Sequence, residues 1–205
     1  MFNFLCVYLL KTTHIYYLYT SIYTMNPEIL LSLENIVGSA YIFTDEATRK
    51  TYGHDETEDL IFPPHVVVKP ANTEEVAQIL RVSNTYKIPT TPIGARTGLS
   101  GGALSIYGGI GISMERFNQI IDIDEQNLQV TTQPGVITQV LREAVAEKGL
   151  FYPVDPSSMG SCFIGGNIAE NSGGARALKY GVTKDYVLNL EVVLPTGDII
   201  WTGAN

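Results

Sequence analysis

Residues 164–187, IGGNIAENSGGARALKYGVTKDYV, form the most informative stretch of this sequence. Two Gly-Gly pairs, at 165–166 and 173–174, flank a segment that carries Asn167 and Asn171. Glycines allow backbone to pack closely on a flat ligand, and asparagine amides both donate and accept hydrogen bonds. The pattern therefore indicates one wall of a ligand site, with two ordinary turns as the alternative interpretation.

A second glycine-rich stretch, TPIGARTGLSGGA, lies upstream at residues 91–103. Its glycines let several backbone N–H groups turn toward one point, which is how a pyrophosphate is held without cations. Thr97 and Ser100 add hydroxyl donors. The stretch has neither the Gly-Lys-Ser/Thr of a Walker loop nor the G-x-G-x-x-G of a Rossmann fingerprint. A mobile surface loop is the alternative, but two such stretches in one chain favour a dinucleotide held between two lobes.

Capping residues and apolar periodicity predict an alternating series of helices and strands. Helices are expected at 26–37, 73–86 and 136–148, where apolar residues share one face. Asn72 and Glu75 have the spacing of an N-terminal capping pair. Short apolar runs between turn residues predict strands, and these lie at 66–68, 90–93, 110–113, 119–123, 128–132, 187–194 and 198–201.

These elements divide into two lobes. The first spans about 60–115 and includes a strand–helix–strand crossover. The second starts near 119 and looks unfinished at 205. Residues 25–59 are expected to form a helix and a lead-in, with the acidic segment 44–64 extended rather than part of the core. Pro195 and Gly197 predict a turn after the strand at 187–194.

Composition narrows the classes of function. The chain of 205 residues is 45% hydrophobic and 17% charged, which suits an ordinary packed core. Its net charge of −8 opposes general nucleic-acid binding. Cys6 and Cys162 have no disulfide-framework or metal-site spacing, so we expect no metal and a cytoplasmic location.

Residues 1–24 have a different character, with five of the twelve Tyr, one Lys and no acidic residue. An export signal would need a basic start and a small-residue cleavage site, and a membrane span needs ~20 mostly apolar residues. Lys11 interrupts the apolar run here. We favour a mis-translated or unstructured extension with the true start at Met25, over a weak membrane or export segment or a genuine structural extension.

Four segments carry a resemblance to a known family. The two glycine-rich stretches, together with YPVDPSS at 152–158 and LEVVLPTGD at 190–198, resemble the PCMH-type FAD-binding domain of the vanillyl-alcohol oxidase superfamily. The similarity covers roughly 60–205 and is closest to the glycolate oxidase flavoprotein subunit and D-lactate dehydrogenase group. It implies an α+β fold of two subdomains that clasp FAD, with the second subdomain incomplete in this chain.

The resemblance also assigns cofactor contacts. It implies that the first loop holds the FAD pyrophosphate, and that 155–157 and 161–167 follow the ribityl chain and the isoalloxazine ring. Residues 171–173 are then near the flavin, and the strand around 192–193 is near the adenine. The implied cofactor-binding residues are Ile93, Gly94, Ala95, Arg96, Thr97, Gly98, Leu99, Ser100, Asp155, Pro156, Ser157, Ser161, Cys162, Ile164, Gly165, Gly166, Asn167, Asn171, Ser172, Gly173, Val192 and Val193.

The chain departs from the family pattern at several positions. Arg96 stands where glycine is frequent, so it either disturbs a left-handed backbone or places a cation beside a phosphate. Ile93 stands where arginine is common. Some superfamily members attach FAD through a histidine in this loop, and because none is present the resemblance implies noncovalent FAD. His54 and His65 lie outside the motifs and are expected at the surface.

The resemblance implies an FAD-dependent oxidoreductase that acts on a 2-hydroxy acid such as glycolate or D-lactate and passes the electrons to an acceptor. The histidine-rich substrate motifs of such proteins lie far downstream, so no catalytic residue is assigned. Lys179, Tyr180 and Lys184 are expected to have structural or peripheral roles. The alternatives are a same-fold oxidase of another alcohol and a flavin-binding module without catalysis of its own. Membrane association is not expected.

Overall fold

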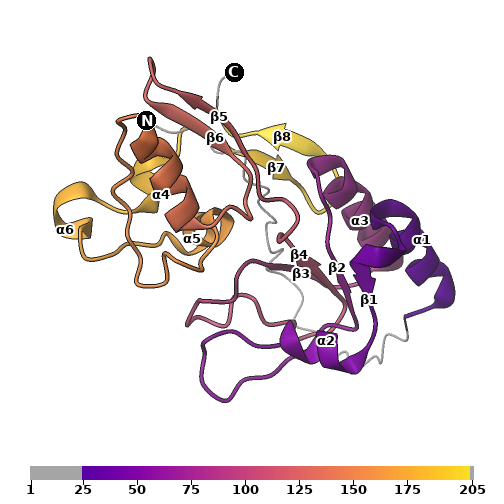
Figure 1. The fold of residues 1–205 in the computed structure, drawn as a ribbon. Coiled ribbons are helices and arrows are strands. Elements are labelled where there is room, and N and C mark those ends of the chain that lie inside the picture. Colours follow the sequence, from indigo (N-terminus) through magenta and orange to yellow (C-terminus); the bar gives the residue numbers. More distant parts are fainter. Residues whose placement is uncertain (1–24, 204–205) are drawn as a thin grey trace.

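A computed structural model describes residues 25–203, in which two α/β lobes face each other (Figure 1). The chain enters through α1 (Pro27–Val37). The Asn26 side chain accepts a hydrogen bond from the N–H of Glu28 at 3.0 Å, and Pro27 fills the first helical position, where its missing N–H costs nothing. This confirms the first predicted helix. The interpretation of residues 1–24 falls outside the described residues.

A four-stranded sheet with the order β1-β2-β4-β3 forms the first lobe. Strand β4 pairs in parallel with both β2 and β3, whereas β1 runs antiparallel to β2. The predicted crossover is present, but β4 lies between the two strands that α3 (Thr73–Tyr86) connects. The strands are β1 (Ile42–Phe43), β2 (Val66–Val68), β3 (Thr90–Ile93) and β4 (Ile110–Ser113).

The sheet is buried on both faces, which explains why β2 is an unbroken run of valine. Val66 and Val68 join the main core, which α1 and α3 supply from one side. Val67 points to the opposite face, where it packs with Tyr52 and Ile93. All three valines are fully buried. The predicted capping pair of α3 is also present, because the Asn72 side chain accepts from the N–H of Glu75 at 2.9 Å.

The acidic segment 44–64 is not wholly extended, and this prediction is wrong at its start. A short 3₁₀ turn, η1 (Ser39–Tyr41), precedes β1, and α2 (Glu46–Thr51) follows it. Asp45 caps α2 by accepting a hydrogen bond from the N–H of Thr48 at 2.8 Å. The helix is followed by Tyr52, whose side chain is buried against Val67 and Ile93 of the sheet.

The second lobe contains an antiparallel hairpin and a set of short helices around a separate core. The hairpin and the following helix agree with their predicted positions to within one or two residues at each end. Apolar side chains of α4 and of the strand-like segment 152–154 fill the core. The elements are β5 (Ile120–Asp124), β6 (Gln129–Thr132), α4 (Thr138–Glu147), α5 (Ile164–Glu170), α6 (Ala177–Tyr180) and η2 (Thr183–Tyr186).

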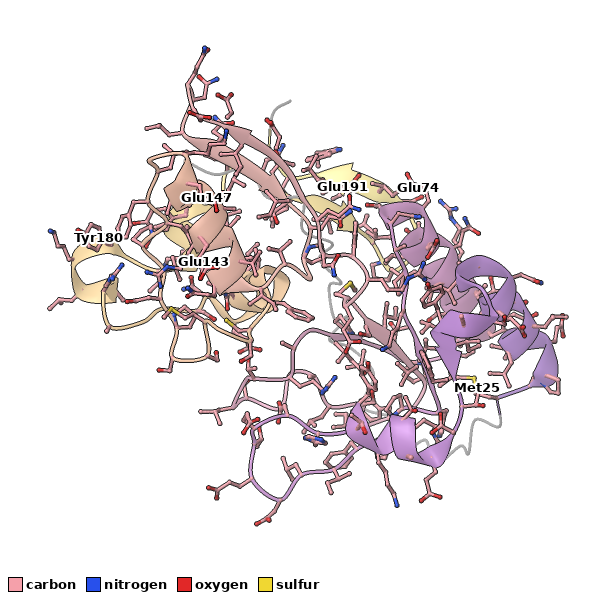
Figure 2. All side chains as sticks on the ribbon, in the orientation of Figure 1. Met25, Glu74, Glu143, Glu147, Tyr180 and Glu191 are labelled. Atoms are coloured by element: carbon pink, nitrogen blue, oxygen red, sulfur yellow. The ribbon has the colours of Figure 1, made fainter. Side chains whose placement is uncertain are left out.

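The last hairpin, β7 (Glu191–Val193) with β8 (Ile199–Trp201), returns to the first lobe and packs beside α3. Thr73 donates a hydrogen bond to the Glu191 carboxylate at 2.6 Å, next to Glu74 at the start of α3 (Figure 2). Val193 is fully buried in the core of the first lobe. The strand predicted at 187–194 is shorter than expected. The predicted turn is confirmed by the hydrogen bond from the N–H of Gly197 to the Leu194 carbonyl.

Candidate functional site

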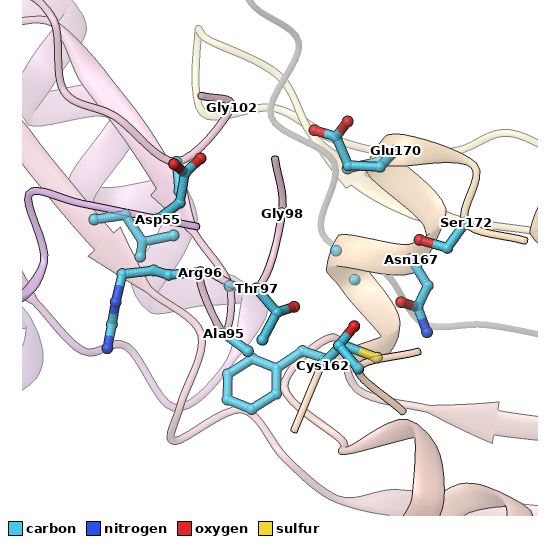
Figure 3. A pocket seen from close by; sticks show the side chains of 18 of the residues that line it. Asp55, Ala95, Arg96, Thr97, Gly98, Gly102, Cys162, Asn167, Glu170 and Ser172 are labelled. Carbon is cyan, nitrogen blue, oxygen red and sulfur yellow. The ribbon is translucent and has the colours of Figure 1, made fainter. Parts of the chain in front are cut away.

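A cavity of about 610 Å³ lies between the lobes. The end of β3 and the loop after it, residues 92–103, form one wall, and residues 158–172, which include α5, form much of the other (Figure 3). The two glycine-rich stretches of the sequence therefore face one space. Its volume is typical of pockets that bury most of a small-molecule ligand.

The first wall exposes a row of unused backbone donors. None of the N–H groups of residues 94–100 donates a hydrogen bond to another described residue. The loop is instead attached to residues 56–57. The Gly98 carbonyl accepts a hydrogen bond from the N–H of Glu56, and the N–H of Gly101 donates to the Thr57 hydroxyl, both at 3.0 Å. Convergent free N–H groups are a means of binding an anion without cations.

Arg96 lies in this loop, but its side chain points away from α5 (Figure 3). Its guanidinium stacks over the Tyr52 ring at 4.5 Å from the centroid, and Nη1 lies 3.8 Å from Oε1 of Glu115. Glu115 also accepts hydrogen bonds from Lys69 and from the Tyr52 hydroxyl, each at 2.7 Å. We call Tyr52, Lys69, Arg96 and Glu115 the Glu115 cluster.

Charge pairing governs the ionisation of the Glu115 cluster. Burial raises the pKa of Glu115, but hydrogen bonds from Lys69 and Tyr52 and the nearby cations outweigh it, so the pKa lies below its ordinary value. Burial lowers the pKa of Lys69, but its hydrogen bond to Glu115 outweighs this and leaves the pKa raised. Both groups are therefore charged at neutral pH.

The sequence left two possibilities for Arg96, and the structure shows elements of each. Its φ of 60° is the left-handed conformation that glycine adopts without cost. Its charge, however, faces the carboxylate of Glu115. Ile93, the other departure from the family pattern, is fully buried and lines the cavity floor beside Tyr52 and Val67.

The second wall is fixed to α4 by buried polar groups. The Asn167 amide donates to the Thr138 hydroxyl at 2.6 Å, and that hydroxyl lies 3.2 Å from the Cys162 sulfur. All three residues are buried, so Asn167 and Cys162 have fixed positions at the cavity edge. Across the cavity, a Cβ built on Gly94 would lie 4.0 Å from the Cα of Gly166, so glycines bring the two walls close together.

Most of the predicted cofactor-binding residues line this cavity. They are Ile93, Gly94, Ala95, Arg96, Thr97, Gly98, Leu99, Ser100, Cys162, Gly165, Gly166, Asn167 and Ser172. The others lie outside the cavity lining, and their assigned contacts stay predictions. They are Asp155, Pro156, Ser157, Ser161, Ile164, Asn171, Gly173, Val192 and Val193.

The outlying residues have structural partners of their own. Asp155 pairs with Arg176 at 3.3 Å. Ile164 is buried in the core of that lobe. Asn171 ends α5 in a left-handed conformation with φ 53°. Val192 and Val193 are buried on β7.

Three lining residues, Asp55, Met114 and Pro134, come from segments to which the sequence assigned no role, and a fourth, Glu170, lies within a predicted wall but was not itself singled out. Asp55 is buried, and its carboxylate accepts from the N–H of Thr57 at 2.9 Å. Glu170 reaches from α5 toward the first loop, where its carboxylate would lie 2.7 Å from a Cβ at Gly102. Nothing in the local sequence pattern distinguishes these side chains from ordinary surface acids or core residues.

His54 is exposed, as expected, whereas His65 is half-buried. Its Nδ1 accepts a hydrogen bond from the N–H of Gly109 at 2.9 Å, which requires that nitrogen to be unprotonated. Burial, with a smaller effect from the charge of Arg49, lowers the pKa of His65 below its ordinary value of 6.5. The neutral ring is thus the form that the folded chain favours.

Acidification should therefore weaken the fold through His65. The folded chain binds this proton less readily than the unfolded chain, so the stabilisation is complete above pH 6.5 and is lost as the pH falls through the lowered pKa. In His65→Asn, whose amide oxygen can accept the same hydrogen bond, we expect the melting temperature to fall less between pH about 7.5 and about 5.5. His54→Asn is the control. Equal falls in His65→Asn and the unmodified chain would contradict this role.

The fold and the cavity define a class of protein: a two-lobed α/β domain with a cavity between two glycine-rich walls. The comparisons with known proteins agree. Residues 64–203 match the family model of an FAD binding domain. The chain belongs to this family, that of the PCMH-type FAD-binding domains.

Two curated relatives and one solved structure illustrate the similarity. The chain is 52% identical to the glycolate oxidase subunit GlcD of Bacillus subtilis (strain 168), over 77% of this chain and 33% of that protein. It is 43% identical to the D-lactate dehydrogenase of Anaerostipes hadrus, over 88% of this chain and 38% of that protein. An alkyldihydroxyacetonephosphate synthase structure matches 89% of this chain and 35% of its own with a TM-score of 0.79 at 22% identity, which bears on the fold alone. The chain thus spans between a third and two fifths of the curated relatives' length.

The residues at the cavity fit the cofactor that the family implies. The free N–H groups of residues 94–100 suit a pyrophosphate, which needs several donors converging on its oxygens. Space is open at Gly98 and Gly166, where a Cβ would meet nothing within 4 Å. The buried amide of Asn167 and the small side chain of Cys162 suit the edge of a flat ring.

Proposed function

We propose that this chain is the FAD-binding part of an FAD-linked oxidoreductase that acts on a 2-hydroxy acid such as glycolate or D-lactate. The observation that carries the proposal is the 52% identity to a glycolate oxidase subunit. The similarity to a D-lactate dehydrogenase supports the same class of substrate. The substrate, and an electron acceptor, would be handled by parts of such a protein that this chain does not include.

In this proposal the chain's own residues bind and orient the cofactor. The loop 94–100 would hold the pyrophosphate through backbone N–H groups, and Asn167, fixed by Thr138, would present its amide at the other wall. When bound, FAD supplies the capacity to accept a hydride equivalent from the carbon that bears the hydroxyl group. No histidine is among the described residues that line the cavity, which supports noncovalent binding.

The first test is flavin retention by the 205-residue chain. The chain is mixed with FAD, separated from free flavin by gel filtration, and its visible absorption spectrum is recorded. We expect bound-flavin bands at close to one FAD per chain, and release of all the flavin on denaturation because binding is noncovalent. A chain that is folded by circular dichroism and retains no flavin would contradict the proposal.

The substrate class is tested by anaerobic reduction of the bound flavin. Glycolate and D-lactate are added to the FAD-loaded chain after it has been joined to the parts of such a protein that would handle the substrate, with glycerol and p-cresol as alcohols of other classes. Loss of the flavin absorption with a 2-hydroxy acid alone is the expected result. Reduction by another alcohol would favour a same-fold oxidase of that alcohol, and reduction by none would favour a flavin-binding module without catalysis of its own.

We also propose that the protein is located in the cytoplasm, and its use of cysteine supports this location. Cys162 is free and buried. Within residues 25–203, no helix has the length and apolar character needed to cross a membrane.

A further inference from the structure

We propose that the side chain of Arg96 has a positioning role: it anchors the loop 94–100 to Tyr52 and Glu115 and so holds the loop's N–H groups in their anion-binding arrangement, while the guanidinium itself does not touch the ligand. This inference rests on the proposed function, because the ligand considered is FAD. It goes further in assigning a task to the guanidinium of Arg96 and to the Glu115 cluster that it joins.

The contacts of Arg96 carry the proposal. Its side chain is 19% exposed and lies against the Tyr52 ring, with Nη1 3.8 Å from Glu115. Nη1 is buried and has no hydrogen-bond partner among the described residues, so Glu115 supplies the carboxylate charge that compensates it. Glu115 is in turn held by Lys69 and the Tyr52 hydroxyl, at 2.7 Å each. The loop is therefore attached through Arg96 to a fixed point at the end of β4.

The loop needs such an attachment. Its N–H groups make no hydrogen bonds within the described chain, and Arg96 itself has the left-handed φ of 60°, which costs free energy for any residue with a Cβ. The links from Glu56 and Gly101 hold the loop only at Gly98 and beyond. Arg96 is the charged anchor at the start of the loop, and holding the loop in its bound shape lowers the entropic cost of binding.

A direct contact of Arg96 with a phosphate predicts the opposite effect at Glu115. If the guanidinium bound phosphate, Glu115→Gln would free its charge and tighten FAD binding. If Arg96 anchors the loop, Glu115→Gln removes the anchor and weakens binding. The sign of the change therefore separates the two roles.

The experiment compares Arg96→Ala, Glu115→Gln and the double variant in the full chain. The dissociation constant for FAD is measured by quenching of flavin fluorescence. We expect each single variant to raise it by roughly tenfold, and the double variant to raise it little further, because both changes break one contact. Alanine keeps the Cβ, so Arg96→Ala leaves the backbone cost unchanged and isolates the side chain.

A second readout needs no FAD. In the ligand-free chain, ¹⁵N relaxation should show order parameters at Ala95 and Thr97 falling from about 0.85 toward about 0.6 in both single variants, with those of α3 unchanged. Arg81→Ala is the matched control: it removes a guanidinium that binds the Gly197 carbonyl at 2.8 Å, far from the loop. It should change neither the loop's order parameters nor the affinity for FAD.

The outcomes separate this proposal from the proposed function. Tighter or unchanged FAD binding in Glu115→Gln, or unchanged loop order in Arg96→Ala, overturns the anchoring role. If the unmodified chain binds no FAD, the proposed function fails and the order parameters alone decide the role of Arg96. If Glu115→Gln also loosens α3, Tyr52→Phe replaces it, since this change removes only the hydroxyl donor to Glu115.

Discussion

Gly98→Trp should abolish flavin retention without unfolding the chain. Gly98 lines the cavity, a Cβ there would meet no atom within 4 Å, and its backbone needs no left-handed conformation. An indole ring can therefore project from the loop without a clash and occupy the space between the walls. We expect the dissociation constant for FAD to rise at least ~100-fold, or about 3 kcal/mol, and the melting temperature to change by less than ~3 °C.

Gly160→Trp is the matched control for this change. A Cβ at Gly160 also meets nothing within 4 Å, but the residue is exposed and lies outside the cavity lining. FAD binding is measured by flavin fluorescence and folding by circular dichroism during heating. Normal binding in Gly160→Trp and none in Gly98→Trp would place FAD between the two walls. Normal binding in both would remove the cavity as the cofactor site.

Gly109→Ala should be among the most destabilising single changes in the described chain. Gly109 has φ 74°, and a Cβ there would lie 2.0 Å from the Pro89 carbonyl oxygen, a backbone atom that cannot turn aside. The same residue donates its N–H to His65 and its carbonyl accepts from the N–H of His65. We expect a loss of roughly 4 kcal/mol in the free energy of unfolding, which corresponds to a fall of roughly 10 °C in the melting temperature.

Gly149→Ala separates the clash from the backbone conformation. Gly149 has a similar φ of 71°, but a Cβ there would meet nothing within 4 Å. This variant should lose only about 1 kcal/mol, the cost of the left-handed conformation. Urea unfolding of both variants measures the difference. Equal losses in the two would mean that the approach of Pro89 to Gly109 relaxes without cost.

The sequence predicted those elements whose signals are local. Helix α3 begins at a capping pair and has apolar residues on one face, and both features depend only on neighbours in the chain. Helix α5 was missed because Gly165, Gly166 and Asn167 have poor helix propensity. Contacts distant in sequence stabilise its first turn: the N–H groups of Ile164 and Gly165 donate to the Val136 and Pro134 carbonyls. Residue patterns within the helix cannot reveal such partners.

The site was predictable to the extent that backbone chemistry defines it. The glycine-rich composition of 94–102 and 165–174 indicated two walls, and residues from both stretches line one cavity. The direction of Arg96 was not predictable, because it depends on Glu115, a residue nineteen positions later in the numbering that β4 brings beside Tyr52. The lining side chains of Asp55 and Glu170 were not predicted for the same reason, because only the tertiary structure places them at the cavity.

The return of the β7–β8 hairpin to α3 also affects how the chain is made. The Thr73–Glu191 hydrogen bond joins residues 118 positions apart, and Val193 completes the core around Val66 and Val76. As the polypeptide leaves the ribosome, the first lobe therefore lacks part of its interior until the whole second lobe has been synthesised. Closing so long a loop is slow, and the part of the first-lobe core that Val193 covers stays open throughout that interval, so we expect the nascent chain to benefit from chaperones that shield apolar surface.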